Sequence, residues 1–185
     1  PQQLRAYKNT RVFIYLIQQQ VTINTYILTL IVLTEPNYAG NIIVILANLP
    51  DFLRKPILKK RMSEFYSMSD AEKIDVIKNA LEAGPTIPFP NFAKLFKTWL
   101  EILAEGEEEE RRMLFSSYIV EISKFPQKLI AFNLDGILEI YLSIENGKKM
   151  VLNNTLKMII ESLEEETKRK LLILVPNSAK KELKI

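Results

Sequence analysis

The chain of 185 residues is long enough to bury one hydrophobic core, and its 48% hydrophobic and 25% charged residues are ordinary for a globular protein. It contains no cysteine and no histidine, which excludes disulfide frameworks, cysteine nucleophiles, most hydrolase triads and nearly all zinc sites. The net charge of +3 comes from the first third, because residues 1–63 carry eight Lys or Arg against two acidic residues.

Residues 12–34 contain no charged side chain, and their length would suffice to cross a bilayer. Three successive glutamines at 18–20 and Asn24 interrupt this stretch, and each amide would be costly in hydrocarbon. We therefore expect two buried helices joined near Gln20, with strands as the alternative, and we expect no membrane partner. An undercharged surface of this kind is typical of contact with another chain. The candidate partner or self-association residues are Tyr26, Ile27, Leu30 and Ile31.

A dense basic cluster follows at residues 54–61, and it is the candidate macromolecule-binding site. Leu58, Met62 and Phe65 form an apolar face, so we expect the basic side chains to share the opposite, exposed side. They could meet phosphates or an acidic partner. A plain solvated face is the alternative, because no aromatic or glycine pattern of a nucleic-acid module accompanies the cluster. Its members are Arg54, Lys55, Lys59, Lys60 and Arg61.

Two helices with well-marked ends come next. Ser69 followed by Glu72 is typical of a capping box, and it predicts a helix that ends at Gly84 and Pro85. The following helix starts at Pro90 and carries one apolar and aromatic face that includes Trp99. We interpret that face as core and not as a ligand groove. The proline-rich connector at 84–90 is predicted to be stiff, with a recognition surface as the alternative.

Four glutamates at 107–110 open a further helix, where the exposed amide dipoles favour negative charge. Pro126 then predicts a helix that continues to Ile144 and is nearly surrounded by apolar residues, so we expect it to be the most buried. Asp135 and Glu139 lie four residues apart on it, and we interpret them as its solvent-facing stripe and not as a cation site. Two last helices are predicted near 148–163 and 164–175.

Two stretches share one plan of helix, proline break, second helix and a loop closing at glycine. They are residues 70–106 and 107–147, which are 37 and 41 residues long. In period and plan this resembles the HEAT or armadillo type of helical repeat. Further pairs are expected at 2–34, 38–67 and 148–184. We predict one all-α domain over residues 1–185 with about 8 to 10 helices. It is either a HEAT-like α-solenoid or an irregular helical bundle, with a possible division between 1–67 and 68–185.

No catalytic, cofactor-binding or metal-binding signature is present, so we predict a non-enzymatic interaction or scaffold protein in the cytoplasm. The expected partner is another protein or a second copy of the chain, with no small-molecule substrate. A nucleic-acid-binding protein that uses the cluster at 54–61 is the alternative, and an enzyme that uses carboxylates and lysines comes third. The sequence opens on Pro1 and shows no leader pattern, so we expect a fragment or processed product without a signal peptide.

Overall fold

The computed structural model describes residues 38–183 of the chain. Within this range it contains nine α-helices, two short 3₁₀ helices and no strand, which confirms the predicted all-α class and the number of helices. The α-helices are α2 (Tyr38–Asn48), α3 (Asp51–Tyr66), α4 (Asp70–Ala83), α5 (Phe89–Glu105), α6 (Glu108–Lys124), α7 (Leu134–Leu142), α8 (Asn146–Ser162), α9 (Glu165–Leu174) and α10 (Asn177–Leu183), and the 3₁₀ helices are η1 (Gly84–Thr86) and η2 (Pro126–Leu129).

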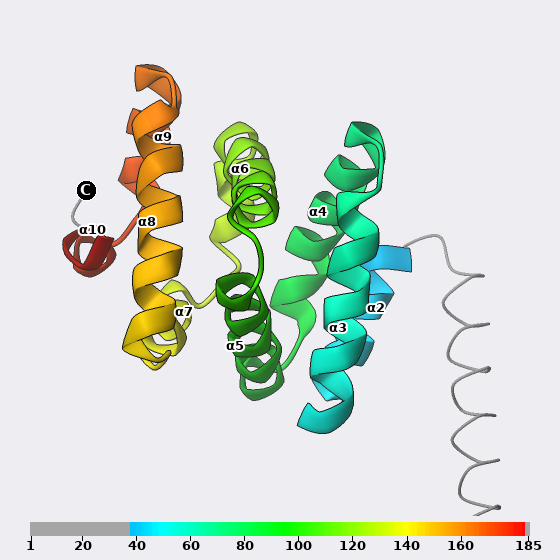
Figure 1. Cartoon of the computed structure of the whole chain (residues 1–185). Coiled ribbons are helices and arrows are strands. Elements are labelled where there is room, and N and C mark those ends of the chain that lie inside the picture. The colour runs from blue at the N-terminus through cyan, green and yellow to red at the C-terminus, as the bar shows by residue number, and fades with distance from the viewer. Residues whose placement is uncertain (1–37, 184–185) are drawn as a thin grey trace, which may run out of the picture.

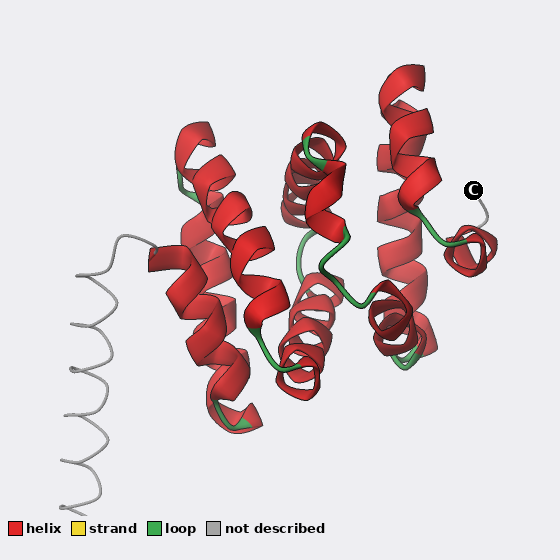
Figure 2. Ribbon diagram, turned by 180° about the vertical axis from the view of Figure 1, so that it is seen from behind, coloured by secondary structure: helices red, strands yellow, loops and turns green. Residues whose placement is uncertain are grey.

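The helices follow one another across the molecule in chain order, from α2, α3 and α4 on one side to α8, α9 and α10 on the other (Figure 1). Short loops join them (Figure 2). Helices two apart in the chain pack together, because α2 contacts α4, α4 contacts α6, α6 contacts α8, α3 contacts α5 and α5 contacts α7. Their starts are evenly spaced: α4, α6 and α8 begin at residues 70, 108 and 146, and α3 and α5 at 51 and 89, each a step of 38 residues.

One cluster of buried apolar side chains runs through the described helices, from Leu46 in α2 to Leu171 in α9. Ile77, Leu103 and Leu152 are its most deeply buried members, and they come from α4, α5 and α8. Burying a side chain of this size contributes about 1.5–3 kcal/mol to folding before entropy is counted. The core therefore ties the two ends of the array together through its middle helices.

Local sequence signals set the starts of these helices. The Ser69 hydroxyl accepts a hydrogen bond from the Glu72 amide, and the Glu72 carboxylate accepts one from the Ser69 amide, so the predicted capping box is confirmed. Pro90 lies in the first turn of α5, where a missing N–H costs nothing. Three glutamates occupy the first turn of α6, as expected for the positive end of a helix dipole.

Two buried arginines each join the end of one helix to the start of the next helix in the chain. Arg54 is the fourth residue of α3, and its side chain donates to the Leu46 and Leu49 carbonyls at the end of α2. Arg111 is the fourth residue of α6, and its Nη1 donates to the Leu103 and Gly106 carbonyls at the end of α5, each at 2.9 Å. Carbonyls at a helix C-terminus have no intrahelical partner and favour positive charge. Each arginine therefore stabilises the connection between two consecutive helices.

The prediction of one continuous helix from Pro126 to Ile144 is wrong. The chain forms η2, then a turn, and restarts as α7, where the Asn133 side chain accepts a hydrogen bond of 3.0 Å from the Gly136 amide. The prediction that this segment would be the most buried is wrong as well, because Ile130 is 82% exposed. The Asn133 cap competes with helix continuation and starts α7 eight residues late.

The break after η2 packs against the segment that joins α4 to α5, through close contacts between aromatic rings and glycines. A Cβ atom on Gly84 would lie 2.8 Å from the Phe132 ring, and one on Gly136 would overlap the Phe89 ring and lie 2.7 Å from Nδ2 of Asn133. Only glycine fits such close approaches. The break after η2 therefore places Phe132 against the η1 loop, which explains why the chain leaves the helix there.

Candidate functional site

The basic cluster predicted at residues 54–61 lies on α3, but its members do not form one exposed set. Arg54 is only 2% exposed, because its guanidinium is bound to carbonyls at the end of α2 and to Asp51. The expectation that it shares an exposed side with the lysines is therefore wrong. The turn between α2 and α3 brings the carbonyls of Leu46 and Leu49 to Arg54 and so directs its side chain inward.

Two more members of the cluster are held in ion pairs. Lys55 lies 3.0 Å from the carboxylate of Glu105 in α5, and Arg61 lies 2.7 Å from Glu64 on its own helix. Lys148 of α8 also bonds Glu105 at 2.6 Å, so hydrogen bonds from both lysines hold the pKa of that carboxyl below its usual value. Within the described part of the chain, Lys59 and Lys60 are thus the members without an ion pair.

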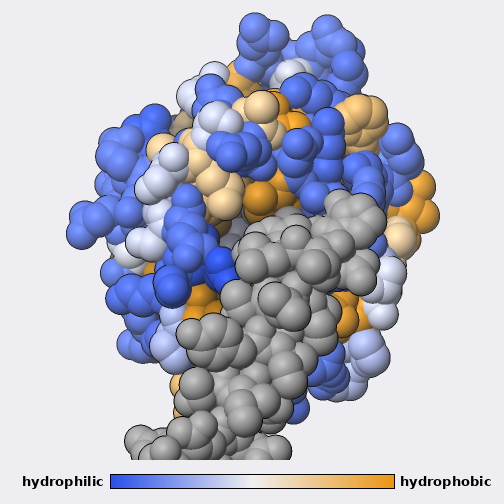
Figure 3. All heavy atoms as spheres, turned by 90° about the vertical axis from the view of Figure 1, so that its right-hand side faces the viewer, coloured by the Kyte–Doolittle hydropathy of each residue, from blue (hydrophilic) through white to orange (hydrophobic). Residues whose placement is uncertain are grey.

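The coloured part of the face in Figure 3, on the side of the molecule where Figure 1 places α2, α3 and α4, carries mainly hydrophilic side chains with apolar ones between them. Phe52 and Ile57 of α3 belong to the exposed apolar residues of the molecule. The other predicted partner surface, formed by Tyr26, Ile27, Leu30 and Ile31, lies outside the described residues.

A surface hollow of about 650 Å³ lies between α9 and α10. These two helices lie at the end of the array opposite to α3 (Figure 1). Leu171 faces the core and is 7% exposed, so Ile173, two residues further along α9, turns outward, and Leu172 between them is partly exposed. Pro176 then ends α9, and α10 begins at the next residue. The lining residues are Glu165, Glu166, Lys168, Arg169, Leu172, Ile173 and Lys180.

The charged side chains of this hollow fall into two groups. Glu165 lies 3.8 Å from Lys168, and Glu166 lies 2.6 Å from Lys170, so both carboxylates have a partner on α9 itself. The hydrogen bond from Lys170 lowers the pKa of Glu166. The side chains of Arg169 and Lys180 make no ion pair or hydrogen bond with the described residues.

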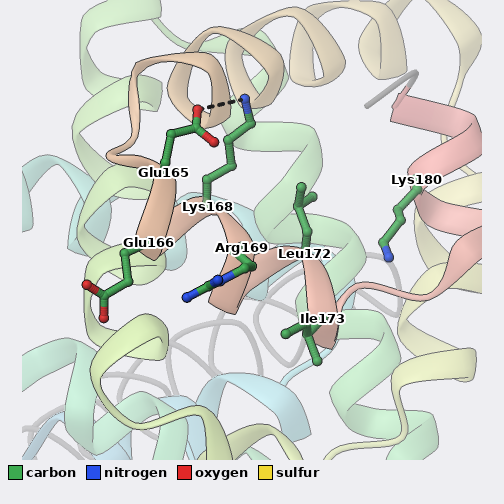
Figure 4. Close-up of a pocket in the computed structure, with 7 residues that line it drawn as sticks. All are labelled: Glu165, Glu166, Lys168, Arg169, Leu172, Ile173 and Lys180. Carbon is green, nitrogen blue, oxygen red and sulfur yellow. Dashed lines mark ion pairs between the residues drawn. The ribbon is translucent and has the colours of Figure 1, made fainter.

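The two unpaired cations flank the apolar side chains. Lys180 reaches from α10 toward the side of α9 that carries Leu172 and Ile173, and Arg169 extends on the other side of them (Figure 4). Ile173 is 76% exposed, among the most exposed large apolar residues described. The arrangement offers an apolar contact with positive charge on both sides.

The remaining candidates have structural roles or lie open to solvent. Asp135 and Glu139 are both exposed, in agreement with their interpretation as a solvent-facing stripe. Trp99 stacks on Phe96, with ring centroids 5.6 Å apart, and both rings pack against the core, which confirms the interpretation of the aromatic stripe. In the described range, no group of three or more acidic side chains could hold a metal ion.

Sequence reasoning missed the hollow. Its apolar residues, Leu172 and Ile173, looked like ordinary helix residues near Pro176. The available signal was the run of four large apolar residues at 171–174, because a helix with 3.6 residues per turn cannot direct four successive side chains toward the core.

None of the helices in the described range is both long and apolar enough to cross a membrane. In the comparisons with known proteins, no family model, no curated protein and no solved structure matches the chain.

Proposed function

We propose that this chain is a non-enzymatic interaction protein, in which a paired-helix array of the α-solenoid type presents a surface to a protein partner. The 38-residue spacing of α3 with α5, and of α4 with α6 and α8, supports the repeat. The packing between helices two apart in the chain supports it as well, because each unit of a solenoid contacts its neighbours. Such arrays are typical of binding proteins and not of enzymes, and a cytoplasmic location stays a prediction.

The observation that carries the proposal is the hollow between α9 and α10. A side chain such as Ile173, left 76% exposed, costs free energy in water that a partner could recover by covering it. Energetically important contacts of protein interfaces are typically apolar anchors surrounded by polar groups. Leu172 and Ile173, with charged residues around them, fit that description.

Nucleic-acid binding through residues 54–61 has less support. One of the five basic residues is buried and two are held in ion pairs, which leaves Lys59 and Lys60 for phosphate contacts. Two lysines would give only a shallow dependence of binding on salt. We therefore favour a protein partner.

The test compares affinity capture by the wild-type chain with capture by Ile173→Asp, followed by reconstitution with the purified captured protein. Met150→Asp is the matched control, because Met150 is 65% exposed on α8 and receives the same substitution away from the hollow. We expect the reconstituted complex to be lost with Ile173→Asp and kept with Met150→Asp. Circular dichroism should show that both variants keep their helices.

A partner that binds both variants equally would contradict the proposal. Light scattering on the purified chain separates the two kinds of partner. A dimer that Ile173→Asp converts to a monomer would identify the partner as a second copy of the chain, whereas a monomer that binds the captured protein would identify a different one.

A further inference from the structure

The hollow between α9 and α10 has an electrostatic preference. From residue 165 to residue 182 the chain carries five basic residues against three acidic ones. Glu165 and Glu166 are already paired within α9, whereas Arg169 and Lys180 are not paired with any described residue. A negatively charged group brought between these two cations would therefore gain ion pairs without breaking existing ones. Complementary charge of this kind steers association and selects the partner.

The dimensions of the hollow fit a short helix. Its lining on α9 extends from Glu165 to Ile173, which is about 12 Å along the helix axis at about 1.5 Å per residue. Two turns of a partner helix have about the same length, roughly 11 Å. Apolar side chains spaced three or four residues apart on such a helix could contact both Leu172 and Ile173.

The other common kinds of ligand fit less well. A strand could not be added, because the backbone groups along α9 are already used in helical hydrogen bonds. The seven lining residues include no aromatic side chain, which polyproline segments and single-stranded nucleic acids need for stacking. A nucleic-acid duplex presents rows of phosphates, for which the two unpaired cations of the hollow are too few. A flat membrane surface could not reach into a hollow.

We infer that the hollow receives an acidic amphipathic helix of the protein partner, with apolar residues against Leu172 and Ile173 and carboxylates at Arg169 and Lys180. This inference rests on the proposed function and adds the chemical class of the partner. It predicts two contributions to the binding affinity, the apolar contact at Ile173 and the charge of the two flanking cations. Substitutions can test each of them separately.

The test selects from a phage-displayed library of helical 16-residue peptides with random surface charge, using the folded wild-type chain as bait. We expect the enriched peptides to carry more Asp and Glu than Lys and Arg, with apolar residues three or four positions apart. A synthetic peptide of the enriched sequence, followed by fluorescence anisotropy, should bind at least tenfold more weakly to the double variant R169E/K180E and to I173D.

The matched control is K59E/K60E, which changes the net charge by the same amount at two exposed, unpaired lysines on α3. It should leave the affinity within about twofold, because α3 and the hollow lie at opposite ends of the array (Figure 1) and salt screens charges on separate surfaces. The inference would be overturned if K59E/K60E lost as much affinity as R169E/K180E. Enrichment of neutral or basic peptides, or no enrichment at all, would overturn it as well. If a captured native partner still depends on Ile173 in those cases, the proposed function stands while the inference about an acidic helix fails.

Discussion

Arg111 offers the sharpest test of how the helices are joined, because it is a buried cation whose partners are helix ends. Its Nε donates to the Thr155 hydroxyl at 2.8 Å, and its Nη1 donates to the carbonyls of Leu103 and Gly106 at 2.9 Å each. One side chain of α6 thus connects the end of α5 to α8. Substitution by alanine removes all three hydrogen bonds and the buried part of the side chain.

The cost can be worked out from these contacts. Hydrogen bonds from a charged donor contribute about 1.5–3 kcal/mol each. Gly106 is exposed, so water can replace the bond to its carbonyl, whereas Thr155 is 1% exposed and Leu103 is 1% exposed. Two bonds are therefore lost without replacement, and we expect Arg111→Ala to lower the free energy of unfolding by about 3–6 kcal/mol.

Urea unfolding followed by circular dichroism at 222 nm measures this change. The matched control is the neighbouring Arg112→Ala, which removes an arginine that is partly exposed and lies 3.8 Å from Glu109, and which should change stability by less than about 1 kcal/mol. Arg111→Lys keeps the charge, so it should lower the free energy of unfolding by less than Arg111→Ala. It keeps the test usable if the alanine variant does not fold. Equal stabilities of the Arg111→Ala and Arg112→Ala variants would refute the role of Arg111.

Three further substitutions test other parts of the structure. Gly136→Ala should cost about 1–3 kcal/mol, because its Cβ would overlap Phe89, whereas Gly147→Ala, whose Cβ would lie 3.8 Å from Oε1 of Glu145, should be neutral or stabilising in thermal unfolding. Glu121→Met should raise the free energy of unfolding by about 1–3 kcal/mol, because Oε1 is buried without a partner; a loss of stability would contradict this. Burial raises the pKa of Tyr118 to about 12, so the folded state holds this proton more tightly than the unfolded chain. Stability should therefore be lost as the pH rises from about 10 toward 12, and Tyr118→Phe should reduce the difference between the urea midpoints at pH 9 and pH 11.

The helices that local signals define were predictable from the sequence. Ser69 and Glu72 form the expected capping box, and Pro90 lies in the first turn of α5 as its sequence context indicated. These signals act through the backbone of the same helix, so no knowledge of the tertiary structure was needed to read them. The apolar spacing of α5 likewise identified its buried face correctly.

The features that depend on distant contacts could not be predicted. The break between η2 and α7 depends on Phe132 packing against Gly84, almost fifty residues earlier in the chain. The local part of that signal was available, because Asn133 followed by Asp135 is typical of a helix start. The burial of Arg54 depends on the angle between α2 and α3, and the hollow depends on the angle between α9 and α10. Neither angle can be read from the periodicity of a single helix.

Hydrogen–deuterium exchange on the chain, with and without its captured partner, tests the proposed interaction surface most directly. Covering Leu172 and Ile173 should slow exchange of the backbone amides of α9 and α10, because a docked partner lowers the population of locally opened helix. We predict protection centred on residues 165–180, with α3 unchanged. Protection confined to α3, with α9 and α10 exchanging at the rate of the free chain, would contradict the account.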